Sequence, residues 1–152
     1  MKFKTDATAI NGRWTLTMDR LAMSHMPATG ASGLDLYIDT PDGLRWAGVG
    51  RPETFPDVET GLVSGMAEGV KSCTVYLPLY NGVSSVEIGI PEGASISAVE
   101  RAPDRKTVLF YGTSITQGAS ASRTGTNHVA RVGRQLDCET INLGFSGHGI
   151  ME

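Results

Sequence analysis

Two loops of this sequence carry the residues that could do chemistry. The first is 112-GTSITQG-118, which follows the apolar run 107-TVLFY-111. Its Ser114 has a hydroxyl group, which becomes an effective nucleophile only beside a general base and an oxyanion hole. The small residues Gly112 and Gly118 would let a substrate approach the backbone there. The alternative is a serine that caps the following helix, and the pattern by itself favours neither interpretation.

Two well-known loops with similar glycine spacing do not match this stretch. A phosphate-binding P-loop needs G-x-x-x-x-G-K-[ST], but Gly112 and Gly118 enclose five residues and Ala119 stands where the lysine belongs. The nucleophile elbow of α/β-hydrolases needs G-x-S-x-G, but Thr116 stands where the second glycine belongs. Neither chemistry is therefore predicted for this loop.

The second loop, 144-GFSGHG-149, follows the short apolar run 140-TINL-143. Its glycine spacing does not fit a dinucleotide fingerprint, and it follows the second strand instead of the first. Backbone N–H groups of such a loop can stabilise a developing oxyanion, because glycine places no side chain in the way. A turn that merely needs positive φ is the competing interpretation. His148 in this loop is expected to line the pocket.

No histidine stands in an evident position to activate Ser114. His128 is near Ser114 in the sequence, but it begins a predicted helix and has no acidic residue in an orienting position. We expect it to be a surface or packing residue. His25 is expected to be structural or to line the rim of the site. The three histidines are too widely spaced to predict a metal site, and no cofactor is implied.

The composition is that of a globular chain without a strong bias. The 152 residues have a net charge of −3, and the 13 lysines and arginines are scattered, so nucleic acid is not expected as a partner. No apolar run can span a membrane, and the first residues lack the apolar core of a signal peptide. We expect a soluble chain, cytoplasmic on the face of the sequence unless a leader is missing. Its oligomeric state, including a homo-oligomer, is left open.

Residues 1–102 predict an antiparallel β-sandwich. Apolar and polar residues alternate in several short runs, as in strands with one buried face. These runs are 13-RWTLTM-18, 33-GLDLYIDT-40, 71-KSCTVYL-77 and 85-SVEIGI-90. The alternation buries Trp14, Leu16 and Met18. It turns Asp35 and Tyr37 toward solvent or a ligand.

The two cysteines, Cys73 and Cys138, are too few for the disulfide framework of a small secreted domain. Cys73 alternates with Val75 and Leu77, which predicts a buried strand thiol.

The pattern changes beyond residue 102, and residues 103–106 are expected to be a linker. The run 107-TVLFY-111 is continuously apolar, as in a strand covered on both faces. The segment 126-TNHVARVGRQLD-137 predicts a helix with Val129, Val132 and Leu136 on one face. Residues 107–152 therefore start a parallel α/β domain. Because two strands cannot form a stable sheet covered on both faces, we expect a chain truncated at its C-terminus.

In this order the motifs resemble the SGNH (GDSL-like) hydrolase superfamily. The run 112-GTSITQG-118 resembles block I, usually G-D-S-x-T, with Thr113 in place of the aspartate. The run 142-NLGFSGHG-149 resembles block II, whose oxyanion-hole glycine maps to Gly147. Upstream, 33-GLDLY-37 matches the GxDLY motif of a β-sandwich that precedes a subset of these esterases. The resemblance implies a jelly-roll-like sandwich followed by the first β–α–β unit of a flavodoxin-like domain.

The resemblance also implies roles for individual residues. Ser114 would be the nucleophile, and the N–H groups of Ser114 and Gly147 would form part of the oxyanion hole. Thr113 and His148 would contact the substrate. A block III asparagine and a block V D-x-x-H would complete the site, but the 152 residues contain neither. We therefore expect an N-terminal piece of a serine carboxylic-ester hydrolase, nearly inactive alone, whose substrate is a small-molecule or carbohydrate ester such as an acetyl ester.

Two other functions are compatible with the predicted sandwich. A carbohydrate-binding module would stack sugars on Trp14, Tyr37, Trp46 or Tyr80, although the alternation places Trp14 on the apolar face. A structural module would instead shape the pocket of the hydrolase with its loops. The sequence leaves both open.

Overall fold

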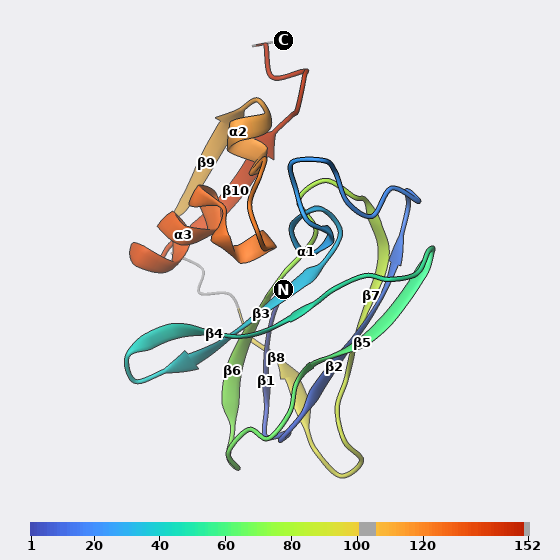
Figure 1. Cartoon of the computed structure of the whole chain (residues 1–152). Helices are drawn as coiled ribbons and strands as arrows, with labels where there is room; N and C mark the ends of the chain where they lie inside the picture. Colours follow the sequence, from blue (N-terminus) through green and yellow to red (C-terminus); the bar gives the residue numbers. More distant parts are fainter. Residues whose placement is uncertain (101–105, 151–152) are drawn as a thin grey trace.

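The computed structural model describes residues 1–100 and 106–150 and is mainly β (Figure 1). The first part contains β1 (Lys2–Thr5), β2 (Ile10–Leu16), the short helix α1 (Ala28–Ala31), β3 (Leu34–Thr40), β4 (Gly43–Gly50), β5 (Asp57–Val63), β6 (Lys71–Tyr76), β7 (Val83–Gly89) and β8 (Ile96–Ala98). These strands form two antiparallel sheets, in the orders β4-β3-β6-β1-β8 and β5-β2-β7. The predicted antiparallel sheets are confirmed, and we call residues 1–98 the sandwich.

Side chains from both sheets meet in one core. Its buried members are Phe3, Ile10, Trp14, Leu16, Leu34, Leu36, Val58, Leu62, Cys73 and Val75. Trp14 has no exposed surface and donates its indole N–H to the carbonyl oxygen of Ser32 at 3.0 Å. Gly48 lets the sheets approach closely, because a Cβ atom there would overlap the carbonyl oxygen of Leu62. Cys73 is buried in this core, so the predicted buried thiol is confirmed, and its burial raises the pKa of the thiol.

Two expectations from the alternation in the runs 13–18 and 33–40 are wrong. Met18 is 46% exposed, because β2 ends at Leu16 and the backbone of Met18 instead bonds to the side chain of Asn81. Asp35 and Tyr37 do not face solvent, since they are only 0% and 5% exposed. Strand β3 is buried on both faces because a later segment of the chain covers the face that the alternation assigns to solvent.

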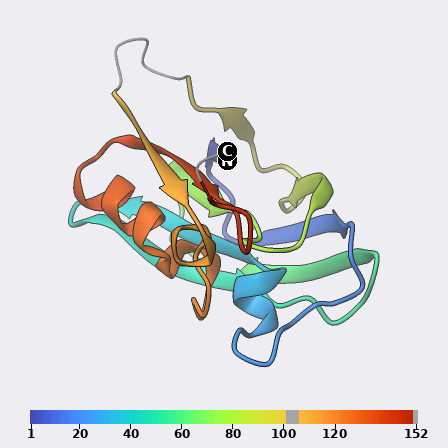
Figure 2. The same cartoon turned by 90° about the horizontal axis from the view of Figure 1, so that it is seen from above.

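That later segment belongs to a second part, which we call the β–α–β unit. It contains β9 (Thr107–Gly112), α2 (Ser114–Gln117), the 3-10 turn η1 (Thr124–Thr126), α3 (His128–Gln135) and β10 (Glu139–Gly144). Strands β9 and β10 are parallel, with Thr107 opposite Glu139 and Gly112 opposite Gly144. The predicted order of strand, loop, helix, strand and loop is confirmed. Seen from above, α3 lies over the sheet that contains β3 and β4, and its Arg134 contacts Tyr37 of β3 (Figure 2).

The helix of this unit is shorter than predicted. Asn127 caps it by accepting a hydrogen bond from Ala130 N at 2.9 Å, and the chain leaves the helix after Gln135. Val129 is buried as expected, but Leu136 lies beyond the last helical turn and is 67% exposed. Its predicted place on the buried face is therefore wrong.

Strand β9 is not covered on both faces by the described residues. Leu109 is 56% exposed and Val108 is 39% exposed, although both belong to the continuous apolar run. The linker expected at 103–106 lies outside the described residues except for Lys106. The domain boundaries near it remain a prediction. None of the helices in the described ranges has the length and apolar content needed to cross a membrane.

Candidate active site

Ser114 lies where β9 ends and α2 begins. The N-cap position of α2 belongs to Thr113, whose side chain makes no capping hydrogen bond, and Ser114 is the first helical residue. The capping interpretation of Ser114 is therefore wrong. Its side chain is half-buried, and within residues 1–100 and 106–150 the hydroxyl forms no hydrogen bond. A hydroxyl without a structural partner is free to react, provided that a base reaches it.

The second glycine loop lies against the first. Because β9 and β10 are parallel neighbours, their carboxyl ends meet at one edge of the sheet, as ligand sites in α/β folds require. Phe145 N donates to the carbonyl oxygen of Gly112 at 2.8 Å. A Cβ atom on Gly149 would overlap that same oxygen. The structure thus brings the loops of Ser114 and Gly147 together.

The conformation of Gly147 is compatible with both interpretations of its loop, and its role as an oxyanion donor stays a prediction. Its φ is +79°, a conformation that side chains disfavour, so the turn needs glycine here. In the described part of the chain its N–H group has no acceptor, whereas the next N–H, of His148, donates to Phe145 O at 3.0 Å. A Cβ at Gly147 would meet open space. An unpaired, exposed N–H is what an oxyanion donor must offer.

Gln117 is a connecting residue that the sequence analysis missed. Its side chain accepts a hydrogen bond from Ser146 N at 2.8 Å and donates one to Leu79 O at 2.9 Å. It therefore joins the glycine loop to the segment between β6 and β7. The backbone of Gln117 also packs against Gly144, where a Cβ atom would overlap Gln117 N. Nothing in the sequence pattern distinguishes this glutamine from a solvent-exposed one.

A hollow of about 450 Å³ opens beside these loops. It is lined by Tyr80, Gln117, Gly144, Phe145, Ser146 and His148. The sandwich contributes Tyr80, whose buried hydroxyl has no hydrogen-bond partner among residues 1–100 and 106–150. His148 is exposed at this hollow, whereas Thr113 is exposed but does not line it. Of the two predicted substrate-binding residues, His148 therefore lines the hollow, and Thr113 instead occupies the N-cap position of α2.

The other histidines lie away from Ser114. His128 begins α3 and is exposed, with its ring 6.0 Å from that of Phe110. His25 is exposed in the sandwich. No histidine or carboxylate of the described ranges forms a hydrogen bond with Ser114. Across the same ranges, no three His, Cys, Asp or Glu side chains are grouped closely enough to hold a metal ion.

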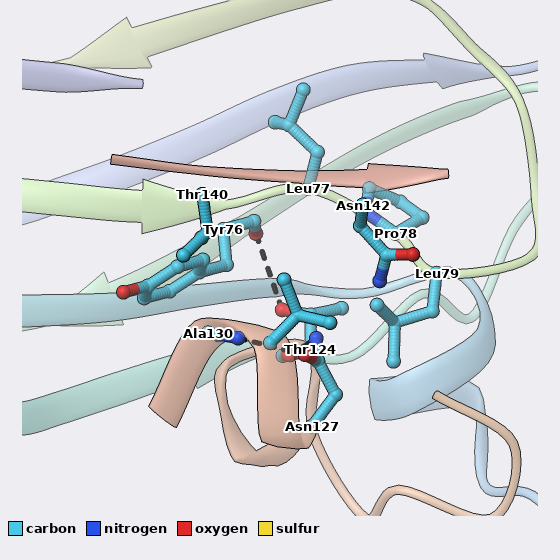
Figure 3. A pocket seen from close by; sticks show the side chains of 10 residues that line it. Tyr76, Leu77, Pro78, Leu79, Thr124, Asn127, Ala130, Thr140 and Asn142 are labelled. Atoms are coloured by element: carbon cyan, nitrogen blue, oxygen red, sulfur yellow. Dashed lines mark hydrogen bonds between the residues drawn. The ribbon is translucent and has the colours of Figure 1, made fainter. Parts of the chain in front are cut away.

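A second cavity of about 220 Å³ separates the sandwich from α3 (Figure 3). The segment Tyr76 to Leu79 forms one wall, and the opposite side comes from Thr124, Asn127, Ala130 and strand β10. A hydrogen bond of 3.3 Å from Thr124 Oγ1 to Tyr76 O spans it. Its walls come from both parts of the chain, and none of the candidate catalytic residues lines it.

Two family models match the chain. The model for the GxDLY N-terminus of SGNH hydrolase-type esterases matches residues 1–96, and that of the GDSL-like lipase/acylhydrolase family matches residues 105–152. No curated protein matches the chain.

Solved structures of three other proteins share the fold. One, described as a GDSL-like lipase from Bacteroides ovatus, is 40% identical with a TM-score of 0.91 over 99% of this chain. The chain spans only 44% of that lipase. A salicylyl-acyltransferase from a tetracycline biosynthetic pathway is 18% identical, with a TM-score of 0.73 over 97% of this chain and 39% of its own. A family two carbohydrate esterase from Clostridium thermocellum is 15% identical, with a TM-score of 0.63 over 99% of this chain and 48% of its own.

Proposed function

We propose that this chain is part of a serine-dependent hydrolase of carboxylic esters. The chain belongs to the family of SGNH hydrolase-type esterases with a GxDLY N-terminal domain. The contact between the loops of Ser114 and Gly147 is the observation that carries this proposal. At one edge of the sheet it brings together a hydroxyl and a backbone N–H that have no hydrogen-bond partner in the part of the chain that the structure describes. These are the nucleophile and the oxyanion donor of an acyl-transfer site.

The proposed reaction proceeds through an acyl-enzyme. Oγ of Ser114 attacks the ester carbonyl carbon while a base takes the hydroxyl proton. The N–H groups of Ser114 and Gly147 stabilise the tetrahedral oxyanion. The ester C–O bond then breaks, and the alcohol leaves with the proton from the base. Water, activated by the same base, releases the carboxylic acid and regenerates Ser114.

We infer a small acyl group such as acetyl, carried by a small-molecule or carbohydrate alcohol. Support comes from the family resemblance and from the fold shared with a carbohydrate esterase. His148 and Tyr80, at the hollow beside the glycine loop, are in a position to contact such a substrate. Thr113 replaces the usual block I aspartate, and it is exposed next to Ser114.

A carbohydrate-binding sandwich is less well supported by the arrangement of its aromatic side chains. Trp14 and Tyr37 are buried and cannot stack on a sugar. Trp46 is half-exposed, but the guanidinium of Arg123 lies 4.5 Å from its ring centroid. Three of the four rings considered for that role are therefore buried or contacted by a guanidinium group.

We expect the 152-residue chain alone to hydrolyse 4-nitrophenyl acetate at close to the uncatalysed rate. The reason is that its described residues bring no base into hydrogen-bond contact with Ser114. The rate should be compared with that of the protein expressed from the complete reading frame, which we expect to be active. Turnover by the 152-residue chain that disappears in Ser114→Ala would show that a base is present after all. An inactive complete protein, tested also on acetylated sugars, would count against the hydrolase itself.

A further inference from the structure

The GxDLY motif contains a buried aspartate that the proposed reaction does not use. Asp35 has no exposed surface, and both of its carboxylate oxygens face N–H donors. Oδ2 accepts a hydrogen bond from Gly125 N at 2.8 Å, and Oδ1 accepts one from the indole nitrogen of Trp46 at 2.9 Å. Nε of Arg123 lies 3.4 Å from Oδ1. Asp35 thus has two hydrogen-bond donors and one ion-pair partner, and Gly125 and Arg123 among them lie outside the sandwich.

The tyrosine of the motif also contacts that unit. The guanidinium carbon of Arg134 lies 4.3 Å from the ring centroid of Tyr37, within the range of a cation–π contact. Arg134 also lies 5.3 Å from the centroid of Tyr76 and donates to Gly125 O at 2.7 Å. The Tyr37 hydroxyl lies 3.4 Å from a guanidinium nitrogen of Arg123. We call Asp35, Tyr37, Trp46, Arg123, Gly125 and Arg134 the Asp35 cluster.

Burial of Asp35 beneath the β–α–β unit disfavours its ionised form. Burial raises the pKa of Asp35 above its ordinary value, although the hydrogen bond from Gly125 and the charge of Arg123 act in the opposite direction. A buried charge of this kind is weak evidence for a contribution to stability, but it can select one arrangement of its neighbours. Replacement of a buried ion pair by apolar residues is often neutral or stabilising.

The turn that Asp35 binds fits the carboxylate closely. A Cβ atom on Gly125 would lie 2.8 Å from Asp35 Oδ2, so only glycine lets the η1 backbone approach this far. The residues that follow η1 lead directly into the cap of α3, where Asn127 also donates from its side chain to Thr124 O at 2.7 Å. A displacement of Gly125 would therefore be passed on to the helix.

We propose that the GxDLY motif is the docking site at which the sandwich holds the β–α–β unit. Asp35 binds the η1 turn at Gly125, and the ring of Tyr37 binds the guanidinium of Arg134. The motif then defines where α3 and the strands beside it lie relative to the sandwich. This assignment does not depend on the role of Ser114.

Amide hydrogen exchange in the whole 152-residue chain tests the docking role. In Asp35→Asn the side-chain amide must turn its NH₂ group toward one of the two donors, so at least one contact of the Asp35 cluster is lost. We expect amides of η1 and α3 to exchange at least about tenfold faster, as loss of a hydrogen bond to a buried charge implies. Amides of the β5-β2-β7 sheet should change less than about twofold, since that sheet lies outside the cluster.

The matched control is Asp39→Asn, which removes the same charge from an exposed position on the same strand. It should leave exchange unchanged in both regions. Equal acceleration in η1, α3 and the β5-β2-β7 sheet would overturn the proposal, because Asp35 would then be a folding residue of the whole chain. Unchanged exchange in η1 and α3 would overturn it as well.

A second variant approaches the contact from the other side. Gly125→Ala leaves the sandwich sequence intact but places a methyl group against Asp35 and Tyr37. We expect the same regional acceleration, together with a shifted indole N–H resonance of Trp46 and an unshifted one of Trp14. Gly61→Ala is the control, because its Cβ would have only an ordinary contact, 3.6 Å from Asn11 Oδ1. An unmoved Trp46 resonance with unchanged exchange in Gly125→Ala would contradict the docking role.

Discussion

Replacement of Ser114 by alanine should lower kcat/KM on 4-nitrophenyl acetate by roughly 10³-fold or more in the protein expressed from the complete reading frame, because the nucleophile of a serine hydrolase accounts for most of the chemical step. The Ser114 hydroxyl makes no hydrogen bond within the described residues, so its removal takes away no structural contact. We therefore expect the loss in kcat, with an unchanged unfolding midpoint.

The matched control for that experiment is Ser122→Ala. Ser122 is exposed and follows α2 in the same loop. Its carbonyl oxygen accepts a hydrogen bond from Thr29 Oγ1 at 2.6 Å, and within the described residues its hydroxyl makes none. Its replacement should leave kcat/KM within about twofold, as is usual for a surface substitution away from a site. A Ser114→Ala protein that retains more than about a tenth of the wild-type kcat/KM would show that another group attacks the ester.

Replacement of Trp14 by alanine should cost the 152-residue chain about 3–5 kcal/mol of unfolding free energy, the usual range for a buried tryptophan. Trp14 lies at the centre of the core between the two sheets and has no exposed surface. The variant also leaves the carbonyl oxygen of Ser32 without the indole donor, in a position where Ser32 itself is fully buried. Urea unfolding followed by circular dichroism measures the change.

Met18→Ala is the comparison that makes the Trp14 result specific. Alternation alone predicts both side chains to be buried, but Met18 is 46% exposed. We expect its replacement to change the unfolding free energy by no more than about 0.5 kcal/mol. A cost below about 1 kcal/mol for Trp14→Ala, or similar costs for the two variants, would contradict the core described above.

The sequence predicted well those features that depend on local pattern. Period-two alternation identified the antiparallel strands, and the apolar run before Ser114 identified β9, because both signals are carried by neighbouring residues. Motif spacing excluded the P-loop and led to the family, which the two family models confirm. The register of β9 and β10 then brings the two glycine loops together without any further information.

The features that the sequence did not predict depend on contacts between distant residues. The alternation assigns Asp35 to the solvent-facing side of its strand, but the backbone N–H of Gly125, 90 residues later, donates a hydrogen bond to its carboxylate. Gln117 reads as an ordinary polar residue, but it joins Leu79 to Ser146. The predicted burial of Leu136 was wrong for a local reason. The helix begins after its cap at Asn127 and ends at Gln135, so Leu136 lies outside it. Periodicity cannot detect such partners, since it reports only which face of an element is apolar.

Peptide mapping of a fluorophosphonate adduct tests the central claim most directly. The protein expressed from the complete reading frame is treated with the fluorophosphonate, digested and examined by mass spectrometry. A nucleophile activated for acyl transfer forms a covalent bond to phosphorus with loss of fluoride, whereas ordinary serines do not react. We predict one adduct, on Ser114 in the peptide that contains 112-GTSITQG-118, in proportion to the loss of esterase activity. Complete loss of activity with the adduct on a different residue would contradict the assignment of Ser114 as the nucleophile.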